Sequence, residues 1–236
     1  FTSGSTGKPK GIVLEHGSIA TALRELDRPL NLSAHNRTLH FASYAFDISL
    51  LEVFACLTFG GCLCIPSHEE RLSDLNGFIE RKRVNWAFMI PSTSHVLEPS
   101  LVPSLNTLVF GGENLRSADV ERWASSDCRL INGYGPAECT PLCVTCRVDP
   151  RNYASGMLGS FATGVGWIVS PSDPSRLCAW GAVGELLIEG PIVARGYFHD
   201  AERTASSFVP SPPWLSRLRG DKIGRLHRTG DLVQYM

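Results

Sequence analysis

Short apolar runs alternate with stretches of helical periodicity through the first 150 residues of the chain. The apolar runs that predict buried strands lie at 38–43, 62–65, 84–90, 105–110 and 128–131. The stretches in which apolar residues recur at helical spacing, and which predict helices, lie at 12–30, 49–58, 72–83 and 117–123. Residues 49–58 are so apolar that this helix is expected to be buried on most of its surface. Because strands alternate with helices, we expect a parallel α/β layered fold.

The pattern changes after about residue 150, where glycine and proline become denser and helices scarcer. Strands are predicted at 184–189 and 232–235. Asp200 can cap one short helix over residues 201–208. Residues 210–219 contain three prolines and are expected to form a mobile loop.

This change of texture divides the chain into two predicted parts. Residues 1–150 form the α/β part. Residues 151–236 form a mainly β part, which we expect to be a small barrel or a distorted sheet. The chain contains no internal repeat, so the two parts are not copies of each other.

The composition is that of an ordinary soluble globular protein, with 43% of the 236 residues hydrophobic and 19% charged. A formal net charge of −1 gives no indication of a nucleic acid or an anionic membrane as partner. No apolar run approaches the roughly 18 residues of a membrane span, and no signal peptide is expected. These features favour a cytoplasmic protein that binds neither nucleic acid nor membrane.

The eight cysteines lie mostly in apolar runs, as in residues 62–65. Cys143 and Cys146 have the CxxC spacing of zinc ligands, but no second pair or nearby histidine completes such a site. We therefore expect reduced, mostly buried thiols of an intracellular protein, without a metal at this pair.

The strongest chemical signal is the loop at residues 1–11, which contains three glycines, four small hydroxyl residues and two lysines. Glycines allow successive backbone N–H groups to turn inward and form a nest for an anion. The hydroxyls add donors and the lysines add positive charge, so a polyphosphate is the expected guest. The spacing differs from a Walker A motif, because only two residues separate Gly4 from Gly7 and Pro9 follows Lys8. A flexible Gly/Ser linker is the alternative interpretation.

Three further loops follow predicted strands, after Ile90, at residues 111–113 and at residues 132–138. Ligands of open α/β sheets bind beyond the carboxyl ends of the strands, where these loops would lie. In the third loop Tyr134 offers a flat face for a base, and Glu138 offers a hard carboxylate for Mg²⁺. Taken alone, residues 132–136 are equally consistent with an ordinary turn.

The order of motifs along the whole chain resembles the adenylation domains of nonribosomal peptide synthetases, within the adenylate-forming enzyme superfamily. The motifs that carry this resemblance lie at residues 1–11, 46–52, 132–138, 184–197 and 227–232. The resemblance implies the layered sheet-and-helix core of the adenylate-forming fold, followed by a mainly β distorted-barrel subdomain. It also implies that the family's N-terminal part and C-terminal subdomain lie outside this sequence. Phe46 and Asp47, followed by Ser49, favour the branch that activates amino acids.

Within this resemblance, several positions are implied to bind ATP. The positions around the β- and γ-phosphates would be Thr2, Ser3, Gly4, Ser5, Thr6, Gly7 and Lys8. The other nucleotide-binding positions would be Gly112, Glu113, Asn132, Gly133, Tyr134, Gly135 and Ala137. Thr6, Lys8 and Glu138 would be the catalytic residues, and Glu138 would also bind Mg²⁺. Many family members have threonine where this chain has Ala137, which puts one phosphate contact in doubt.

Asp231 is implied to accept hydrogen bonds from both ribose hydroxyls, and charge-assisted bonds of this kind are strong. The alternative for Asp231 is a turn cap after Gly230. Asp47 would pair with the α-ammonium group of the substrate, because an unpaired carboxylate in an apolar stretch is costly. The alternative for Asp47 is to cap the helix that begins near Ser49.

The implied substrate pocket contains one charged side chain, that of Asp47, and otherwise lacks strong hydrogen-bonding groups. Its predicted lining is Asp47, Ile48, Leu51, Met89, Val109, Gly111, Gly133, Pro141 and Leu142. A polar substrate side chain would be left unpaired in this lining. We therefore expect a medium to large apolar α-amino acid.

The implied reaction is the attack of an amino-acid carboxylate on the α-phosphate of ATP, which forms aminoacyl-AMP and releases pyrophosphate. The aminoacyl group would then pass to the phosphopantetheine thiol of a peptidyl carrier domain, next to a condensation domain in the same polypeptide. The family's catalytic lysine lies beyond Met236, so this chain alone is expected to have little activity. The alternatives are a stand-alone acyl or aryl acid ligase and a nucleotide-binding module without turnover.

Overall fold

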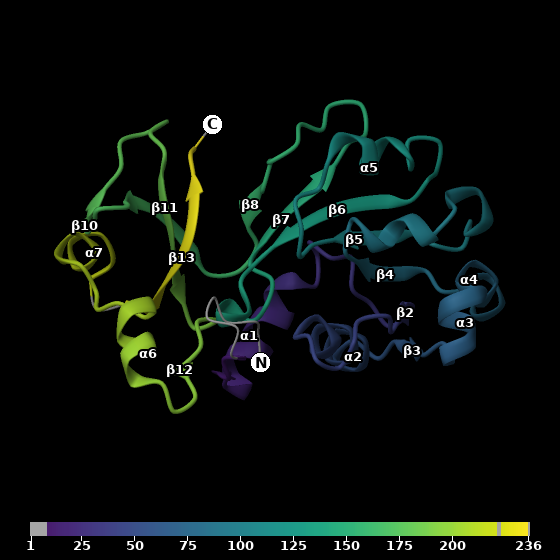
Figure 1. Cartoon of the computed structure of the whole chain (residues 1–236), viewed down its shortest axis with the longest axis horizontal. Coiled ribbons are helices and arrows are strands. Elements are labelled where there is room, and N and C mark those ends of the chain that lie inside the picture. The colour runs from purple at the N-terminus through teal and green to yellow at the C-terminus, as the bar shows by residue number, and fades with distance from the viewer. Residues whose placement is uncertain (1–8, 221–222, 236) are drawn as a thin grey trace. The chain divides into compact units, whose positions relative to one another are not determined.

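The computed structural model describes residues 9–220 and 223–235, and its contacts divide the chain into two units (Figure 1). The parallel-sheet unit consists of residues 23–135 and 144–162. The antiparallel-sheet unit consists of the described residues within 1–22, 136–143 and 163–236. The chain therefore passes between the units more than once, and the division at residue 150 stays a prediction.

The parallel-sheet unit contains a seven-stranded sheet of order β3-β2-β4-β5-β6-β7-β8. Its strands are β2 (Arg37–Leu39), β3 (Cys62–Cys64), β4 (Trp86–Met89), β5 (Thr107–Phe110), β6 (Arg129–Tyr134), β7 (Val144–Val148) and β8 (Ser160–Phe161). The strands from β3 to β6 pair in parallel, whereas β7 and β8 add antiparallel pairs. Every residue of β4 and β5 is buried, as expected for parallel strands covered on both faces.

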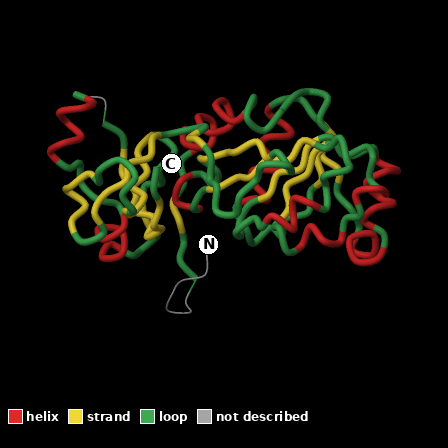
Figure 2. Tube along the Cα trace, turned by 90° about the horizontal axis from the view of Figure 1, so that it is seen from above, coloured by secondary structure: helices red, strands yellow, loops and turns green. Residues whose placement is uncertain are grey.

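Helices lie on both sides of this sheet (Figure 2). They are α2 (Ile48–Thr58), α3 (His68–Ser73), α4 (Leu75–Lys82), α5 (Ser117–Glu121) and the 3₁₀ helices η1 (Thr93–Val96) and η2 (Pro99–Leu101). The core between sheet and helices includes Phe78, Phe110 and Trp123, all of them almost fully buried. Trp86 is fully buried on β4, and its indole N–H donates a hydrogen bond of 2.8 Å to the carbonyl of Leu30.

Helix α2 is less buried than its sequence predicts. Ser49, Leu51, Glu52, Ala55 and Cys56 face the core. Its other face carries apolar residues that remain exposed in the unit, namely Leu50, Phe54 and Leu57. The expectation of burial on most of the surface is therefore wrong for this unit, because apolar composition alone does not distinguish the two faces of a helix.

The antiparallel-sheet unit contains a four-stranded sheet of order β10-β9-β11-β13 and a separate two-stranded ribbon. Its strands are β9 (Val165–Ser170), β10 (Asp173–Leu177), β11 (Gly184–Gly190) and β13 (Arg225–Val233), with β1 (Ile12–Val13) and β12 (Gly196–Tyr197) in the ribbon. Its helical elements are η3 (Ala137–Cys139), α6 (Ala201–Ser207) and α7 (Pro213–Arg219), and α1 (His16–Leu26) begins here. The expected fold class, an α/β part together with a mainly β part, is confirmed.

Two predictions for the second half of the chain are corrected. Residues 210–219 were expected to form a loop, but Pro213–Arg219 is helix α7. Proline is well suited to the first helical position, where its missing N–H has no intrahelical partner. Leu215 then anchors the helix, because it is fully buried and belongs to a core with Val169 and Leu187.

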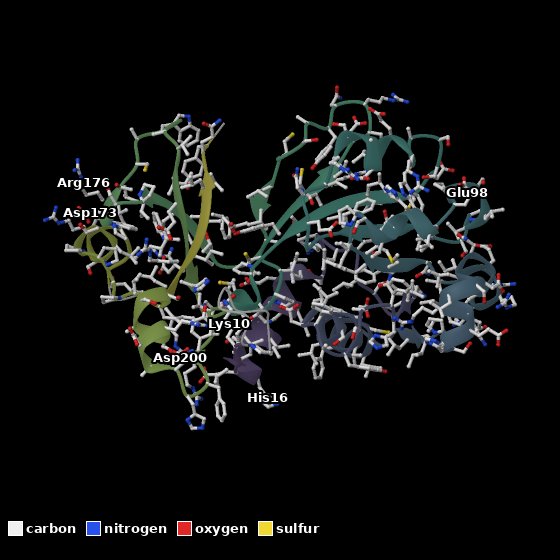
Figure 3. All side chains as sticks on the ribbon, in the orientation of Figure 1. Lys10, His16, Glu98, Asp173, Arg176 and Asp200 are labelled. Atoms are coloured by element: carbon white, nitrogen blue, oxygen red, sulfur yellow. The ribbon has the colours of Figure 1, made fainter. Side chains whose placement is uncertain are left out.

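Strand β13 is the second correction, since it begins at Arg225 rather than at residue 232. The strand begins earlier than predicted because Leu226 and His227, near its start, are buried. The Asp200 cap is confirmed, since its carboxylate accepts a hydrogen bond of 3.0 Å from the Arg203 N–H (Asp200 is labelled in Figure 3).

The eight cysteines are all free thiols, and four of them are partly or fully exposed, so the expectation of mostly buried thiols holds for only half of them. Among residues 9–220 and 223–235, no three histidine, cysteine or acidic side chains gather closely enough to hold a metal ion. None of the helices in this described part is long and apolar enough to cross a membrane.

Leu108→Ala is expected to lower the free energy of unfolding by about 2–5 kcal/mol, because it leaves a cavity at a fully buried position on β5. The matched control is Leu72→Ala on α3, where the side chain is 73% exposed, and a change within about 0.5 kcal/mol is expected there. Urea-induced unfolding of both variants measures the difference. Equal losses would contradict the position of Leu108 in the core.

Candidate functional site

The predicted phosphate loop is only partly covered by the structure. Thr2, Ser3, Gly4, Ser5, Thr6, Gly7 and Lys8 lie outside the described residues. The end of the loop is described from Pro9 onward, and it leads directly into β1. Its second lysine, Lys10, can therefore be located within the antiparallel-sheet unit (Figure 3).

Lys10 lies in a cluster with Glu138 and Tyr197, which come from three distant parts of the chain. The Lys10 ammonium group donates a hydrogen bond of 2.7 Å to Oε1 of Glu138. The Tyr197 hydroxyl donates a bond of 2.7 Å to the same oxygen. The Lys10 ammonium also lies 3.3 Å from the Tyr197 hydroxyl and 4.8 Å from the centre of its ring. Oε1 of Glu138 thus accepts hydrogen bonds from both the Lys10 ammonium group and the Tyr197 hydroxyl.

Backbone pairing explains how these residues meet. Ile12 on β1 pairs with Tyr197 on β12, so the residues that precede β1 run alongside the end of β12. The Phe198 N–H donates to the carbonyl of Gly11 at 2.8 Å and extends this pairing toward Lys10. Glu138 is held from the other side, because its carbonyl accepts a hydrogen bond of 2.8 Å from the Ala194 N–H.

Glu138 is 5% exposed, and its charge depends on these partners. Burial would raise the pKa of Glu138, but the hydrogen bonds from Lys10 and Tyr197 outweigh it and lower the pKa overall. For Lys10, burial would lower the pKa, and the bond to Glu138 outweighs this effect and raises it. The two groups therefore form a charged pair at neutral pH. His227 lies in the same unit, and burial lowers its pKa, which favours the neutral ring.

Glu138 could hold Mg²⁺ only in company with other ligands. Mg²⁺ usually takes one or two protein carboxylates and completes its octahedral shell with water and substrate phosphates. A single carboxylate such as that of Glu138 therefore fits a metal that arrives with phosphates. The ammonium of Lys10 supplies a second positive charge beside the same position.

Strands β4, β5 and β6 bring several predicted positions together at their carboxyl ends. Their parallel register pairs Met89 with Phe110 and Phe110 with Asn132. A Cβ atom added at Gly111 would lie 2.6 Å from the Phe88 ring and 2.9 Å from the Gly133 carbonyl. Glycine at position 111 is therefore required for this close approach of strand ends.

The predicted adenine-site residues have clear local partners in the parallel-sheet unit. The motif at residues 132–134 is part of β6 itself rather than a separate turn. The side-chain amide of Asn132 donates a hydrogen bond of 2.8 Å to the Met157 carbonyl. The Glu113 carboxylate accepts bonds of 3.2 and 3.0 Å from the backbone and hydroxyl of Ser92. Gly112 has a φ of +84°, which suits glycine at the turn after β5.

The residues predicted around the amino acid are divided between the two units. Asp47, Ile48, Leu51, Met89, Val109, Gly111 and Gly133 belong to the parallel-sheet unit, whereas Pro141 and Leu142 belong to the other. Asp47 is the N-cap residue of α2, and its carboxylate accepts a hydrogen bond of 2.9 Å from the Ile48 N–H. The capping role is thus present. That these nine residues line one pocket stays a prediction.

Asp231 is exposed on β13, where a bulge interrupts the pairing with β11. Its backbone N–H donates a hydrogen bond of 3.0 Å to the hydroxyl oxygen of Thr229. Gly230 between them has a φ of +80° and supplies the turn that the sequence indicates. A ribose-binding role for Asp231 stays a prediction.

The sequence does not indicate the role of Glu52 in shaping the segment before Asp47. This carboxylate is fully buried, and its Oε2 lies 2.7 Å from Nδ1 of His40. Both of its oxygens accept the Ala42 N–H at 3.2 Å, so it fixes the chain where β2 ends. Arg71 donates to the His40 carbonyl at 3.2 Å and secures the same segment. The one available signal was an acidic residue within an otherwise apolar helix.

Comparisons with known proteins agree with one another. The family of AMP-binding enzymes matches residues 1–198. The nonribosomal peptide synthetase notE′ of Aspergillus versicolor is 50% identical over 238 residues, which cover 100% of this chain and 11% of that protein. The chain therefore spans about a tenth of that relative's length.

Two solved structures resemble the fold closely. The Vibrio cholerae adenylation domain AlmE, in complex with glycyl-adenosine-5′-phosphate, has 27% identity and a TM-score of 0.83, covering 98% of this chain and 44% of that one. Holo-PA1221, an NRPS protein containing adenylation and PCP domains bound to a vinylsulfonamide inhibitor, has 27% identity and a TM-score of 0.83. That match covers 100% of this chain and 41% of the other.

Glu52→Gln is expected to flatten the dependence of stability on pH between about pH 6.5 and 8. Burial raises the pKa of Glu52 to about 8, so its contribution to stability is complete below about pH 4.5 and is lost as the pH rises through about 8. Burial lowers the pKa of His40, whose own contribution is lost as the pH falls below about 6.5, so the range from about pH 6.5 to 8 reports Glu52.

Urea unfolding across this range measures the effect, with Glu121→Gln on the exposed surface of α5 as the control. The control should keep the slope of the unsubstituted protein. If Glu52→Gln also keeps that slope, Glu52 does not hold a proton in the folded state.

Proposed function

Because this chain belongs to the AMP-binding enzyme family, we propose that its protein activates an amino acid as aminoacyl-AMP for nonribosomal peptide synthesis. The observation that carries the proposal is the Lys10–Glu138 ion pair. It joins the end of the predicted phosphate loop to the predicted Mg²⁺ ligand within one unit. The similarity to a nonribosomal peptide synthetase over the whole chain supports the amino-acid branch.

The proposed chemistry is the attack of the substrate carboxylate on the α-phosphate of ATP, with departure of pyrophosphate. Both reactants are anions, so the protein acts mainly by positioning them and neutralising charge. Lys10 and the loop of residues 2–8 would face the phosphates, and Asp231 would hold the ribose. Mg²⁺, held by Glu138 together with the phosphates, would supply further neutralisation of charge. The expectation that residues 1–236 alone have little activity stays a prediction.

The amino acid would be bound through Asp47 and an apolar lining. Leu51, Met89 and Val109 are buried in the parallel-sheet unit, which supports an apolar surround near the strand ends. The hydrogen bond from the Ile48 N–H would hold the Asp47 carboxylate in a fixed orientation toward the substrate ammonium group. A medium to large apolar α-amino acid remains the proposed substrate class.

The proposed acceptor of the aminoacyl group is the phosphopantetheine thiol of a peptidyl carrier domain. The structurally similar protein PA1221 contains adenylation and PCP domains, which supports this partner. A condensation domain in the same polypeptide is the second proposed partner, and the proposed location is the cytoplasm. An acyl or aryl acid ligase remains the second candidate function, because Asp47 caps α2 and so has a role that needs no ammonium group.

Asp231→Ala, in the complete adenylation domain, is expected to raise the KM for ATP about tenfold or more. Each lost charge-assisted hydrogen bond to ribose is worth about 1.5–3 kcal/mol. Asp173→Ala on β10 of the same sheet is the control, and it should leave the KM unchanged because Asp173 bonds only locally to Ser175 in the described structure. Unchanged ATP affinity in Asp231→Ala would rule out the ribose role.

A panel of amino acids tested by pyrophosphate exchange is expected to give the highest activity with a medium to large apolar side chain. A polar side chain would lose a few kcal/mol through unpaired groups in the proposed lining. Discrimination against a substrate one methylene shorter should be only about 10- to 200-fold. Preference for Asp, Lys, Ser or Asn would contradict this substrate class. Equal activity with a des-amino acid would contradict the role of Asp47 and favour the acid ligase.

A further inference from the structure

Strand β13 carries a pronounced bulge opposite β11. On either side of it, Glu185 pairs with Leu232 and Leu187 pairs with Arg228. Between these pairs β11 contributes a single residue, whereas β13 contributes residues 229–231. The surplus residues cannot join the ladder, so the chain leaves the plane of the sheet just where Asp231 lies.

The side chain of Glu185 on β11 bonds to two residues of β13 at the bulge. Its side chain is 7% exposed and forms a forked ion pair with Arg228, whose Nε lies 3.1 Å from Oε1 and whose Nη2 lies 2.5 Å from Oε2. Oε1 also accepts the backbone N–H of Gly230 at 3.2 Å. One buried carboxylate therefore holds both the residue before the bulge and the residue at its centre.

The other hydrogen bonds of the bulge involve Thr229, which connects β11 to Asp231. The Thr229 hydroxyl donates to the Leu186 carbonyl at 2.8 Å and accepts the Asp231 N–H at 3.0 Å. Gly230 has a φ of +80°, a conformation that residues with side chains adopt only at a cost. The backbone of Asp231 is thus fixed through Thr229 on one side and through the bond from Gly230 to Glu185 on the other.

Glu189 on the same strand is a buried glutamate with a structural role, and it serves as the comparison for Glu185. It is 1% exposed and accepts bonds of 2.9 Å from the Trp167 indole and 3.1 Å from the Gly224 N–H. Its burial and its partners resemble those of Glu185, but it lies away from the bulge, opposite Leu226. The two glutamates differ mainly in whether their bonds reach the segment that carries Asp231.

We propose that Glu185 is a positioning residue for nucleotide binding: through Arg228 and the Gly230 N–H it fixes the bulge that presents Asp231 to the ribose. The proposal rests on the ribose role given to Asp231 under the proposed function. Glu185 itself touches no substrate in this arrangement. It acts by restricting the backbone of Asp231, the residue that would contact the ribose.

The test compares Glu185→Gln with Glu189→Gln in the complete adenylation domain. Glutamine keeps the size of the side chain but removes the charge that holds Arg228. Loss of a charge-assisted contact predicts a rise of about tenfold in the Kd for ATP in Glu185→Gln, measured by isothermal titration calorimetry. The KM for the amino acid should not change. Glu189→Gln should leave both constants unchanged while losing a comparable amount of thermal stability.

Two further measurements separate positioning from general destabilisation. With 2′-deoxy-ATP, which lacks one of the ribose hydroxyls, the effect of Glu185→Gln should be smaller than with ATP. The double variant Glu185→Gln with Asp231→Ala should bind ATP no more weakly than Asp231→Ala alone, because residues that act as one unit are not additive. If Glu185→Gln does not fold, Arg228→Lys replaces it, since lysine keeps the charge but loses the fork.

The outcomes distinguish this proposal from the one on which it rests. If Asp231→Ala weakens ATP binding but Glu185→Gln has no larger effect than Glu189→Gln, the positioning role is overturned and the ribose role stands. Additive effects in the double variant also overturn the positioning role. If Asp231→Ala leaves ATP binding unchanged, the ribose role itself is overturned, and the inference about Glu185 is overturned with it.

Discussion

The hydrogen bonds that Glu138 accepts from Lys10 and Tyr197 are the interaction on which the candidate site depends. A carboxylate buried to this degree would be protonated or destabilising without such partners. Lys10 and Tyr197 lie far apart in the sequence. The Glu138 carboxylate can therefore bind both of them only when β1 and β12 pair to form the ribbon. The predicted phosphate loop therefore ends at a position that the fold has already fixed, beside a carboxylate kept anionic by its bonds to Lys10 and Tyr197.

Buried glutamates also hold the chain at Glu52 and Glu185, and each is bound to a backbone N–H group as well as to a basic side chain. Both side chains hold a short irregular segment next to a residue predicted to contact substrate, Asp47 in one case and Asp231 in the other. Irregular backbone lacks the ladder bonds of a strand and must find other partners. A buried carboxylate with several acceptor positions provides them without adding a longer element.

The sequence predicted the parallel strands well, because runs such as 84–90 and 105–110 are apolar on both faces and bounded by turn residues. It also indicated Glu138 and Asp231 as candidate site residues through their motifs, and their roles stay predictions. It could not predict the partners of Glu52 or Glu185, because pairing across 12 or 43 residues depends on which strands meet. Tyr197 was missed for the same reason. Helix α7 was missed because three prolines suggest a loop, whereas proline at a helix start is compatible with helix.

Asp47 illustrates why a structural role does not exclude a chemical one. Its carboxylate caps α2 through the Ile48 N–H, which by itself would account for an aspartate at this position. An ionised carboxylate has about four acceptor positions, so serving as a helix cap does not by itself exclude a second role. The cap holds the side chain at the N-terminus of α2, where the helix dipole favours negative charge. A residue that is anionic and held in one orientation is better prepared to bind an ammonium group than a mobile one, because less entropy is lost on binding.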